Sequence, residues 1–459
     1  MITDDGTTVS VQLAQSLVNQ GWKVILLSFP ESIVEEKLPL PKGINRVSLI
    51  DMSEEHFKQQ LSWIANNYGA VGGFIHLNPL SMSNNTAKVI LKQVFLIAKY
   101  LQKSLNTAAK KGRSWFVTVS RLDGELGIGN QTSFNPIGGG LFGLTKTLNL
   151  EWEKVFCRAI DISINLETQV VVDSIITELY DPNNFIYEVG YSPQGRVTLV
   201  GEDDLIVDNS HNSISQDTVF LVTGGGRGIT AQCTIKLAKY CQCKFILLGR
   251  SQLKDEPEWA KNYSDEIELK KQAFSVLNSQ GEKPNPAEIH KLVREILANR
   301  EIENNLQQIK LLGGQAEYLS VDITDNINLA FRLDDVVEKF GKITGIIHGA
   351  GILADKLIEN KTEVDFERVY STKVAGLENL LNCVNENHIK HLILFSSAAG
   401  FYGNIGQSDY AIANEILNKF AHQFKYKYPE CQVISFNWGP WESGMVTPEI
   451  GRASCRERV

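Results

Sequence analysis

The fold of this chain is decided at residues 219–230, where the sequence reads VFLVTGGGRGIT. Apolar, β-prone residues are followed by a glycine-rich turn, and a helix-like stretch begins directly after it. Glycine lets a chain turn sharply and approach a bound group closely, and the first turn of the next helix offers free N–H groups to phosphate. A strand, a glycine-rich turn and a helix in this order predict a nucleotide-binding unit.

Strand-like and helix-like segments alternate along the whole chain. Short apolar runs rich in β-prone residues occur at Val24–Leu27, Phe74–Leu77, Trp115–Val119, Phe245–Leu248 and Leu392–Phe395. Continuous apolar strands between helices are typical of parallel sheets that helices cover on both faces. We therefore expect an α/β fold built on doubly wound parallel sheets.

The two halves of the chain correspond to each other. Val24–Leu27 matches Phe245–Leu248, and Gly73–His76 matches Gly345–His348, but the second pair is about 51 positions farther apart than the first. This pattern predicts one doubly wound unit used twice, in tandem, with an insertion of about 51 residues in the second copy. The turn of the second copy, Gly224–Gly226, contains no acidic residue. The corresponding positions of the first copy include Asp4 and Asp5, whose negative charges argue against nucleotide binding there.

The domain boundaries are expected in polar segments. A Ser/Asn-rich linker at Gly201–Gln216 separates the copies, and the insertion at about 252–312 is charged. We expect its helices, over 287–311, to lie on the surface away from the chemistry. The predicted domains are a structural copy over 1–211, a catalytic copy over 212–447, and a non-native or truncated tail over 448–459.

Composition excludes several classes of protein. The chain has 459 residues, 43 % of them hydrophobic and 21 % charged, which is ordinary for a globular protein. A formal net charge of -8 disfavours nucleic-acid partners, and the sequence has no apolar run long enough for a membrane span. Seven scattered cysteines predict reduced thiols and a cytoplasmic location without a metal site, and His76 and His348 are expected to pack at strand ends.

The second strand of the catalytic copy ends in Gly249-Arg250-Ser251. A carboxylate at this place suits the ribose hydroxyl of NAD, whereas a cation suits a 2′-phosphate, so Arg250 and Arg227 favour NADPH. The alternative is that Arg250 simply lies solvated at a strand end. The expected cofactor residues, including an adenine contact at Asp322, are Thr223, Gly224, Gly225, Arg227, Gly228, Ile229, Arg250, Ser251, Asp322, Ile323, Gly349, Ala350 and Gly351.

Farther along the chain are four residues that together could catalyse the reduction of a ketone. Hydride transfer to a carbonyl needs a proton for the forming alkoxide, and Tyr410 is the candidate acid. An ammonium at Lys373 would lower the pKa of that phenol, and Ser397 could donate a hydrogen bond to the carbonyl oxygen. Asn414 lies one helical turn after Tyr410. Taken singly, Tyr410 could be a half-buried aromatic residue and Lys373 a solvated one, but their joint order after the glycine-rich turn favours catalysis.

At this point the sequence resembles the ketoreductase domains of type I polyketide synthases and polyunsaturated fatty acid synthases, which are complex short-chain dehydrogenases/reductases. The resemblance extends to about residue 447. It implies two tandem Rossmann-like copies, a structural one without cofactor and a catalytic one, with Lys373, Ser397, Tyr410 and Asn414 as the active tetrad. The matching motifs are Thr223–Gly225, Asp322, Gly349–Gly351, Lys373, Ser396–Gly400, Gly406–Gln407, Tyr410–Asn414 and Asn437–Trp441.

Some positions depart from the simpler reductase pattern. Asn414 stands where simple short-chain reductases have the lysine, as in the polyketide-synthase type, and Thr230 replaces the final glycine of the turn. Only the second acid of the family's Leu-Asp-Asp motif is present, at Asp355, and Tyr402 stands where the opposite stereochemical class has tryptophan. We therefore expect the D-hydroxyl product. The expected substrate and stereocontrol residues are Asp355, Gln407 and Trp438.

The resemblance also implies the reaction and its partners. The substrate would be a β-ketoacyl chain bound through phosphopantetheine to an acyl carrier protein, beside adjacent synthase domains of a much larger polypeptide. A shortened C-terminus would impair reduction. One alternative is a stand-alone reductase of a free small ketone, which the repeated copy disfavours because a simple reductase needs one copy. The other is a non-catalytic scaffold, which the four intact candidate residues disfavour.

Overall fold

The computed structural model describes residues 1–35, 37–80, 82–129, 133–202, 214–279 and 285–441. The predicted boundary near 212 and the predicted tail over 448–459 lie outside these residues. The chain forms two compact units: the first comprises Met1–Ile206, Ile352–Val374 and Ser396–Gly439, and the second comprises Val207–Gly351, Ala375–Phe395 and Pro440–Val459. The chain passes repeatedly from one unit to the other, so neither corresponds to one continuous segment.

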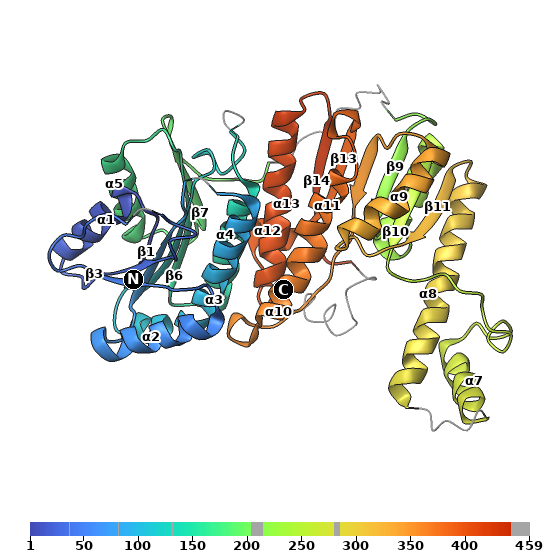
Figure 1. Cartoon of the computed structure of the whole chain (residues 1–459), viewed down its shortest axis with the longest axis horizontal. Helices are drawn as coiled ribbons and strands as arrows, with labels where there is room; N and C mark the ends of the chain where they lie inside the picture. Colours follow the sequence, from blue (N-terminus) through green and yellow to red (C-terminus); the bar gives the residue numbers. More distant parts are fainter. Residues whose placement is uncertain (36, 81, 130–132, 203–213, 280–284, 442–459) are drawn as a thin grey trace. The chain divides into compact units, whose positions relative to one another are not determined.

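An eight-stranded sheet forms the centre of the first unit (Figure 1). Its strands pair in parallel except for the last, which is antiparallel to its neighbour. The spatial order is β3 (Asn45–Ser48), β2 (Ile25–Ser28), β1 (Ile2–Asp4), β4 (Gly73–Leu77), β5 (Trp115–Ser120), β6 (Phe156–Ile162), β7 (Glu188–Ser192) and β8 (Gly195–Val197). The order reverses between β1 and β4, as a doubly wound sheet requires.

Helices cover both faces of this sheet. One apolar core lies beneath α1 (Thr8–Asn19) and α5 (Thr168–Leu179). The core of the other face packs beneath α2 (Glu54–Tyr68), α3 (Asn84–Ala109) and α4 (Gly140–Glu151). Every residue of β5 and β6 is buried, which explains the largely apolar sequence of β5.

The first unit also contains the later segments α10 (Glu363–Tyr370), α12 (Ala398–Tyr402), α13 (Ser408–Lys427) and β14 (Gln432–Trp438). Helix α13 packs closely against α4. At Gly143 the two helices are so near that a Cβ there would overlap the backbone of Ala411. A buried ion pair joins the same helices, since Lys146 Nζ lies 3.6 Å from Glu415 Oε1, and within α13 Lys419 Nζ lies 2.9 Å from the same oxygen. These contacts fix the position of the helix that carries Tyr410.

The second unit is built around parallel strands in the order β11 (Gln315–Ser320), β10 (Lys244–Gly249), β9 (Val219–Thr223), β12 (Gly345–His348) and β13 (His391–Ser397). The last two residues of β13, Ser396 and Ser397, belong to the first unit. Its helices include α6 (Gly228–Cys241), α9 (Asn326–Phe340) and α11 (Gly376–Asn382). The strands β9, β10 and β12 take the same places in this sheet as β1, β2 and β4 in the other. The predicted α/β fold with two Rossmann-like parallel sheets is therefore confirmed.

The repeat extends to side chains at the strand ends. Thr3 Oγ1 lies 3.0 Å from His76 Nδ1, and Thr223 Oγ1 lies 2.9 Å from His348 Nδ1. Burial lowers the pKa of His76 to about 3. In each copy a threonine from the first strand thus hydrogen-bonds a buried histidine from the neighbouring strand.

The insertion forms two helices, α7 (Glu266–Ser279) and α8 (Pro286–Leu311), which pack on each other around Leu269 and Val293 (Figure 1). Asn285 and Glu288 form a capping box at the start of α8. The expectation that these helices lie away from the chemistry is wrong. One face of α8 packs on the glycine-rich turn, where Asn305 Nδ2 donates to the carbonyl oxygen of Gly226 at 3.0 Å.

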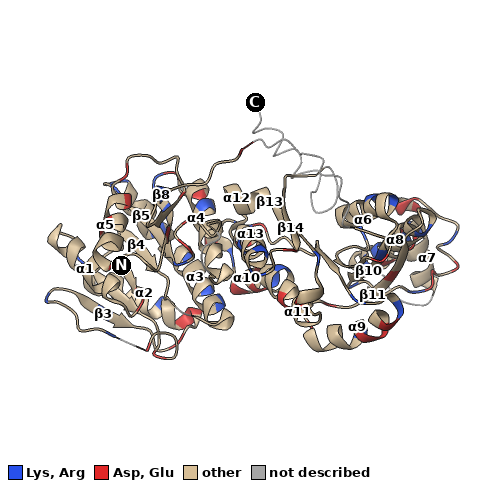
Figure 2. Ribbon diagram, turned by 90° about the horizontal axis from the view of Figure 1, so that it is seen from above, with Lys and Arg blue, Asp and Glu red and all other residues tan. Residues whose placement is uncertain are grey.

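Charges of both signs occur on the helices of either unit, as Figure 2 shows. Among the described residues, no three His, Cys, Asp or Glu side chains group in a way that could hold a metal ion. No helix in the described ranges combines the length and the apolar character that a membrane span needs.

Candidate active site

At the glycine-rich turn of the second unit, hydrogen bonds connect the carboxyl ends of the neighbouring strands β9 and β12. Thr223 Oγ1 accepts hydrogen bonds from the backbone N–H groups of Gly349 and Ala350, each at 3.1 Å. Gly224 has a φ of +69°, and a Cβ there would lie 3.1 Å from the carbonyl carbon of Gly349. Glycine is required at this position both by the backbone conformation and by the close approach of the two strand ends.

The threonine that replaces the last glycine of the turn has a structural explanation. Thr230 is buried, and a Cβ on Gly349 would overlap its side chain. The Thr230 side chain therefore fits because the residue that faces it after β12 is Gly349, which has no side chain. The residue type at position 230 alone does not reveal this exchange.

Helix α6 begins within the turn. Arg227 is its N-cap residue, and Gly228, with a φ of +64°, has open space around its Cβ position. The N–H of Gly228 donates to Glu301 Oε1 of α8 at 2.9 Å. A carboxylate from the insertion therefore already interacts with the electropositive end of α6, where helices commonly bind anions.

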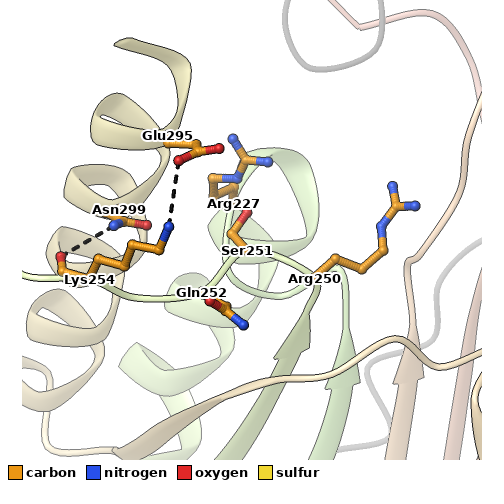
Figure 3. Close-up of a pocket in the computed structure, with 7 residues that line it drawn as sticks. All are labelled: Arg227, Arg250, Ser251, Gln252, Lys254, Glu295 and Asn299. Atoms are coloured by element: carbon orange, nitrogen blue, oxygen red, sulfur yellow. Dashed lines mark hydrogen bonds and ion pairs between the residues drawn. The ribbon is translucent and has the colours of Figure 1, made fainter. Parts of the chain in front are cut away.

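A basic pocket lies beside this turn (Figure 3). It has a volume of about 420 Å³ and is lined by Arg227, Arg250, Ser251, Gln252, Lys254, Glu295 and Asn299. Arg227 comes from the turn before α6, and Arg250 and Ser251 follow β10. Three cations and one carboxylate line the pocket, and this excess of positive charge suits a phosphate group. Arg250 is exposed, and its side chain extends away from Arg227 and Glu295 (Figure 3).

Asp322 and Ile323 lie outside the lining of this pocket. Asp322 Oδ1 accepts from the N–H of Thr324 at 2.9 Å and from its hydroxyl group at 2.8 Å, which forms a turn. The Ile323 carbonyl oxygen accepts from Asn379 Nδ2 at 2.8 Å. These interactions shape the loop after β11. The adenine contact expected at Asp322 stays a prediction.

The candidate catalytic residues Lys373, Ser397, Tyr410 and Asn414 all belong to the first unit. Lys373 lies in a π-helical turn, Ser371–Ala375, and is only 2 % exposed. Its Nζ lies 5.4 Å from the centre of the Tyr410 ring. On α13, Asn414 lies one turn after Tyr410, and its Nδ2 donates to the Tyr410 carbonyl oxygen at 2.8 Å. Three of the four residues are thus close neighbours.

Burial determines the protonation of this pair. Desolvation lowers the pKa of Lys373 to about 7. Desolvation also raises the pKa of Tyr410, and the charge of Asp355 adds to the increase, while Asn414 opposes it. The expectation that Tyr410 has a lowered pKa is therefore wrong in direction, because the cost of burying a phenolate outweighs the stabilising groups around it.

Ser397 is the last residue of β13 and the N-cap of α12. Its Oγ accepts from the N–H of Ala399 at 3.2 Å and donates to the carbonyl oxygen of Trp438 at 3.5 Å. Helix α12 packs against α13, since a Cβ at Gly400 would lie 3.0 Å from the Cβ of Asn414. The serine is thus positioned by a helix start beside the helix of Tyr410.

The predicted stereocontrol residues Asp355 and Gln407 contact each other. Gln407 Nε2 donates to Asp355 Oδ2 at 2.9 Å. The N–H of Lys356 donates to the Gly406 carbonyl oxygen at 2.9 Å. Trp438 lies on β14, where its ring stacks on that of Phe436 with 5.1 Å between centroids. Two segments that are distant in sequence therefore meet immediately before Tyr410.

A buried ion pair at this place was not predicted from the sequence. Lys361 Nζ lies 2.5 Å from Asp409 Oδ1, and both side chains are completely buried. Neither residue belongs to a recognised motif, and a lone lysine in a polar loop normally predicts a solvated side chain. The adjacency of Asp409 to Tyr410 was the one available signal.

The chain is similar in sequence to known proteins. Residues 218–443 match the family model described as KR domain. The chain is 35 % identical, over 98 % of its length, to a polyunsaturated fatty acid synthase from a Thraustochytrium species, but covers only 16 % of the matched polypeptide. It is 26 % identical over 67 % of its length to polyketide synthase PksL of Bacillus subtilis, covering 6 % of it.

The fold is also found in solved structures. The crystal structure of an N-terminal ketoreductase from the macrolactin assembly line superposes with a TM-score of 0.67 at 19 % identity, over 99 % of this chain and 83 % of that one. The paired Rossmann-like sheets, the glycine-rich turn and the lysine beside Tyr410 define a protein of the complex short-chain reductase class. Residues 218–443 belong to the KR domain family, and the chain is similar to polyunsaturated fatty acid and polyketide synthases.

Proposed function

We propose that this chain reduces the keto group of a β-ketoacyl thioester to a hydroxyl group with NADPH. The observation that supports this most directly is the position of Lys373 Nζ, 5.4 Å from the centre of the Tyr410 ring. When bound, NADPH supplies the hydride that adds to the carbonyl carbon. The ketone, NADPH and one proton thereby give the alcohol and NADP⁺.

Residues of the chain donate the proton and stabilise the charges that develop during its transfer. The raised pKa keeps Tyr410 protonated near neutrality, so its hydroxyl group is a proton donor for the forming alkoxide. The phenolate left behind lies beside Lys373, whose ammonium form stabilises it. Ser397 Oγ donates a hydrogen bond to the carbonyl oxygen, which favours the developing negative charge.

The preference for NADPH over NADH rests on the basic pocket. Arg227, Arg250 and Lys254 provide cations for a 2′-phosphate. The proposed cofactor residues are those expected from the sequence, with Lys254 added.

The acyl chain is proposed to be carried by an acyl carrier protein through phosphopantetheine, with adjacent synthase domains as further partners, because the relatives are synthases. We propose the D-hydroxyl product, with Asp355 and Gln407 beside Tyr410 in control of the configuration. Trp438 is the third proposed substrate residue.

The test is NADPH oxidation by the 459-residue chain with a β-ketoacyl thioester surrogate, comparing wild type with Tyr410→Phe. We expect the substitution to lower the rate about 10²- to 10⁴-fold, the usual contribution of a positioned acid. Tyr240→Phe, at a tyrosine 74 % exposed on α6, is the matched control and should retain full activity.

Equal rates for wild type and Tyr410→Phe would exclude the proposed acid. Faster turnover of a free small ketone than of the thioester would favour a stand-alone reductase. A folded wild-type protein that binds NADPH and reduces neither substrate would favour the scaffold alternative.

A further inference from the structure

Lys361 links two segments that meet next to the proposed catalytic tyrosine. Its Nζ donates to Asp409 Oδ1 at 2.5 Å and to the carbonyl oxygen of Ala354 at 2.7 Å. Asp409 immediately precedes Tyr410, and the same Oδ1 accepts the backbone N–H of Tyr410 at 2.8 Å. One ammonium group therefore connects the start of the Tyr410 helix with the residue before Asp355.

Further contacts hold the same two segments together. Gln407 Nε2 donates to Asp355 Oδ2 at 2.9 Å. From α4, Glu151 accepts the N–H of Ile358 at 3.0 Å through one carboxylate oxygen and the N–H of Gly406 at 2.9 Å through the other. The Lys361 contact differs from these because its acceptor side chain also binds the Tyr410 backbone.

Stability alone gives little reason for such a pair. Both side chains of the pair are fully buried, and the desolvation of two charges offsets much of their attraction, so apolar replacements are often as stable. A buried ammonium with two fixed acceptors does, however, specify one relative position of the groups that it joins. Here those groups are the backbone before Asp355 and the first turn of α13.

We propose that Lys361, through Asp409, is a positioning residue that fixes Asp355 relative to Tyr410 and thereby determines which face of the ketone is reduced. The inference rests on the proposed function. When the pair is lost, the segment that carries Asp355 is held less firmly against the Tyr410 helix, and the ketone can bind in either orientation. Loss of both members of the pair therefore changes the ratio of the product enantiomers more than it changes the melting temperature.

The experiment compares wild type, Lys361→Met and the double variant Lys361→Met/Asp409→Asn. The readouts are the ratio of the two hydroxyacyl enantiomers, kcat, KM and the melting temperature. The single variant leaves a carboxylate buried without its cation, so we expect a lower melting temperature. The double variant removes both charges and should recover the melting temperature.

We expect the enantiomer ratio to fall at least tenfold in both variants, with a larger change in kcat than in KM. Lys58→Met, at a lysine 44 % exposed that pairs with Glu54 on α2, is the control and should retain the wild-type ratio. A double variant with wild-type melting temperature and wild-type ratio would overturn the inference while leaving the proposed function intact. A wild-type chain that does not reduce the thioester would overturn both.

Discussion

Replacing Lys373 by methionine should make this protein more stable while abolishing reduction. Lys373 is 2 % exposed, and burial lowers its pKa from 10.5 to about 7. Below about pH 7 both the folded and the unfolded chain carry the proton, so the full cost of the buried charge is present. Between about pH 7 and 10.5 only the unfolded chain binds the proton, and stability rises with pH.

The size of the effect follows from the difference in pKa. A shift from 10.5 to about 7 corresponds to about 5 kcal/mol at 1.36 kcal/mol per unit, which is an upper bound. Methionine has a similar length and no charge, but it loses the hydrogen bonding of the ammonium group, about 1 kcal/mol. We expect Lys373→Met to be more stable by about 2–4 kcal/mol at or below neutral pH.

The assay is unfolding by heat and by urea, followed by tryptophan fluorescence, at several values between about pH 6 and pH 10. The advantage of the variant should be greatest at the acid end and should shrink toward the alkaline end. Lys339→Met, at a lysine 66 % exposed on α9, is the control and should show no such trend. A variant that is no more stable at about pH 6, or whose advantage does not depend on pH, would refute the reasoning.

Three further predictions concern the cofactor turn, the basic pocket and the proton donor. Gly349→Ala should destabilise the protein by about 1–3 kcal/mol in urea unfolding, because the new methyl group overlaps Thr230, and adding Thr230→Gly should restore stability. If the double variant is no better, the overlap is not the cause. Arg250→Ala should raise the KM for NADPH about tenfold and change that for NADH little, since a charge-assisted hydrogen bond to phosphate is lost; equal changes for both cofactors would contradict this role. The rate of ketone reduction by wild type should fall as pH rises through about 7, where Lys373 loses its proton; a flat rate profile across that range would show that the neutral amine suffices.

Much of the fold could be predicted from local sequence. The run Val219–Thr230 contains a buried strand, a turn with glycine at φ +69° and +64°, and the start of a helix, and short-range backbone preferences indicate each of these. The matching strand sequences of the two halves likewise predicted that one doubly wound unit is used twice. The spacing of Tyr410 and Asn414 placed them one turn apart on a helix, as observed.

Two expectations failed because they depended on burial. The charged insertion looked solvated, yet α8 brings Glu301 to the N–H of Gly228, since one face of a helix can pack while the other stays charged. The pKa of Tyr410 was expected to fall through its neighbour Lys373. Desolvation, which no local pattern of residues reports, raises it.

The sequence by itself determined the alternation of strands and helices, the duplication and the residue types around Tyr410, because these follow from periodicity and from short-range backbone preferences. Only the tertiary structure decided that Lys361 and Asp409, 48 positions apart, form a fully buried pair beside that tyrosine. The charge of a lysine is written in the sequence. Its surroundings, and therefore its partner and the cost of its burial, exist only once distant segments have packed around it.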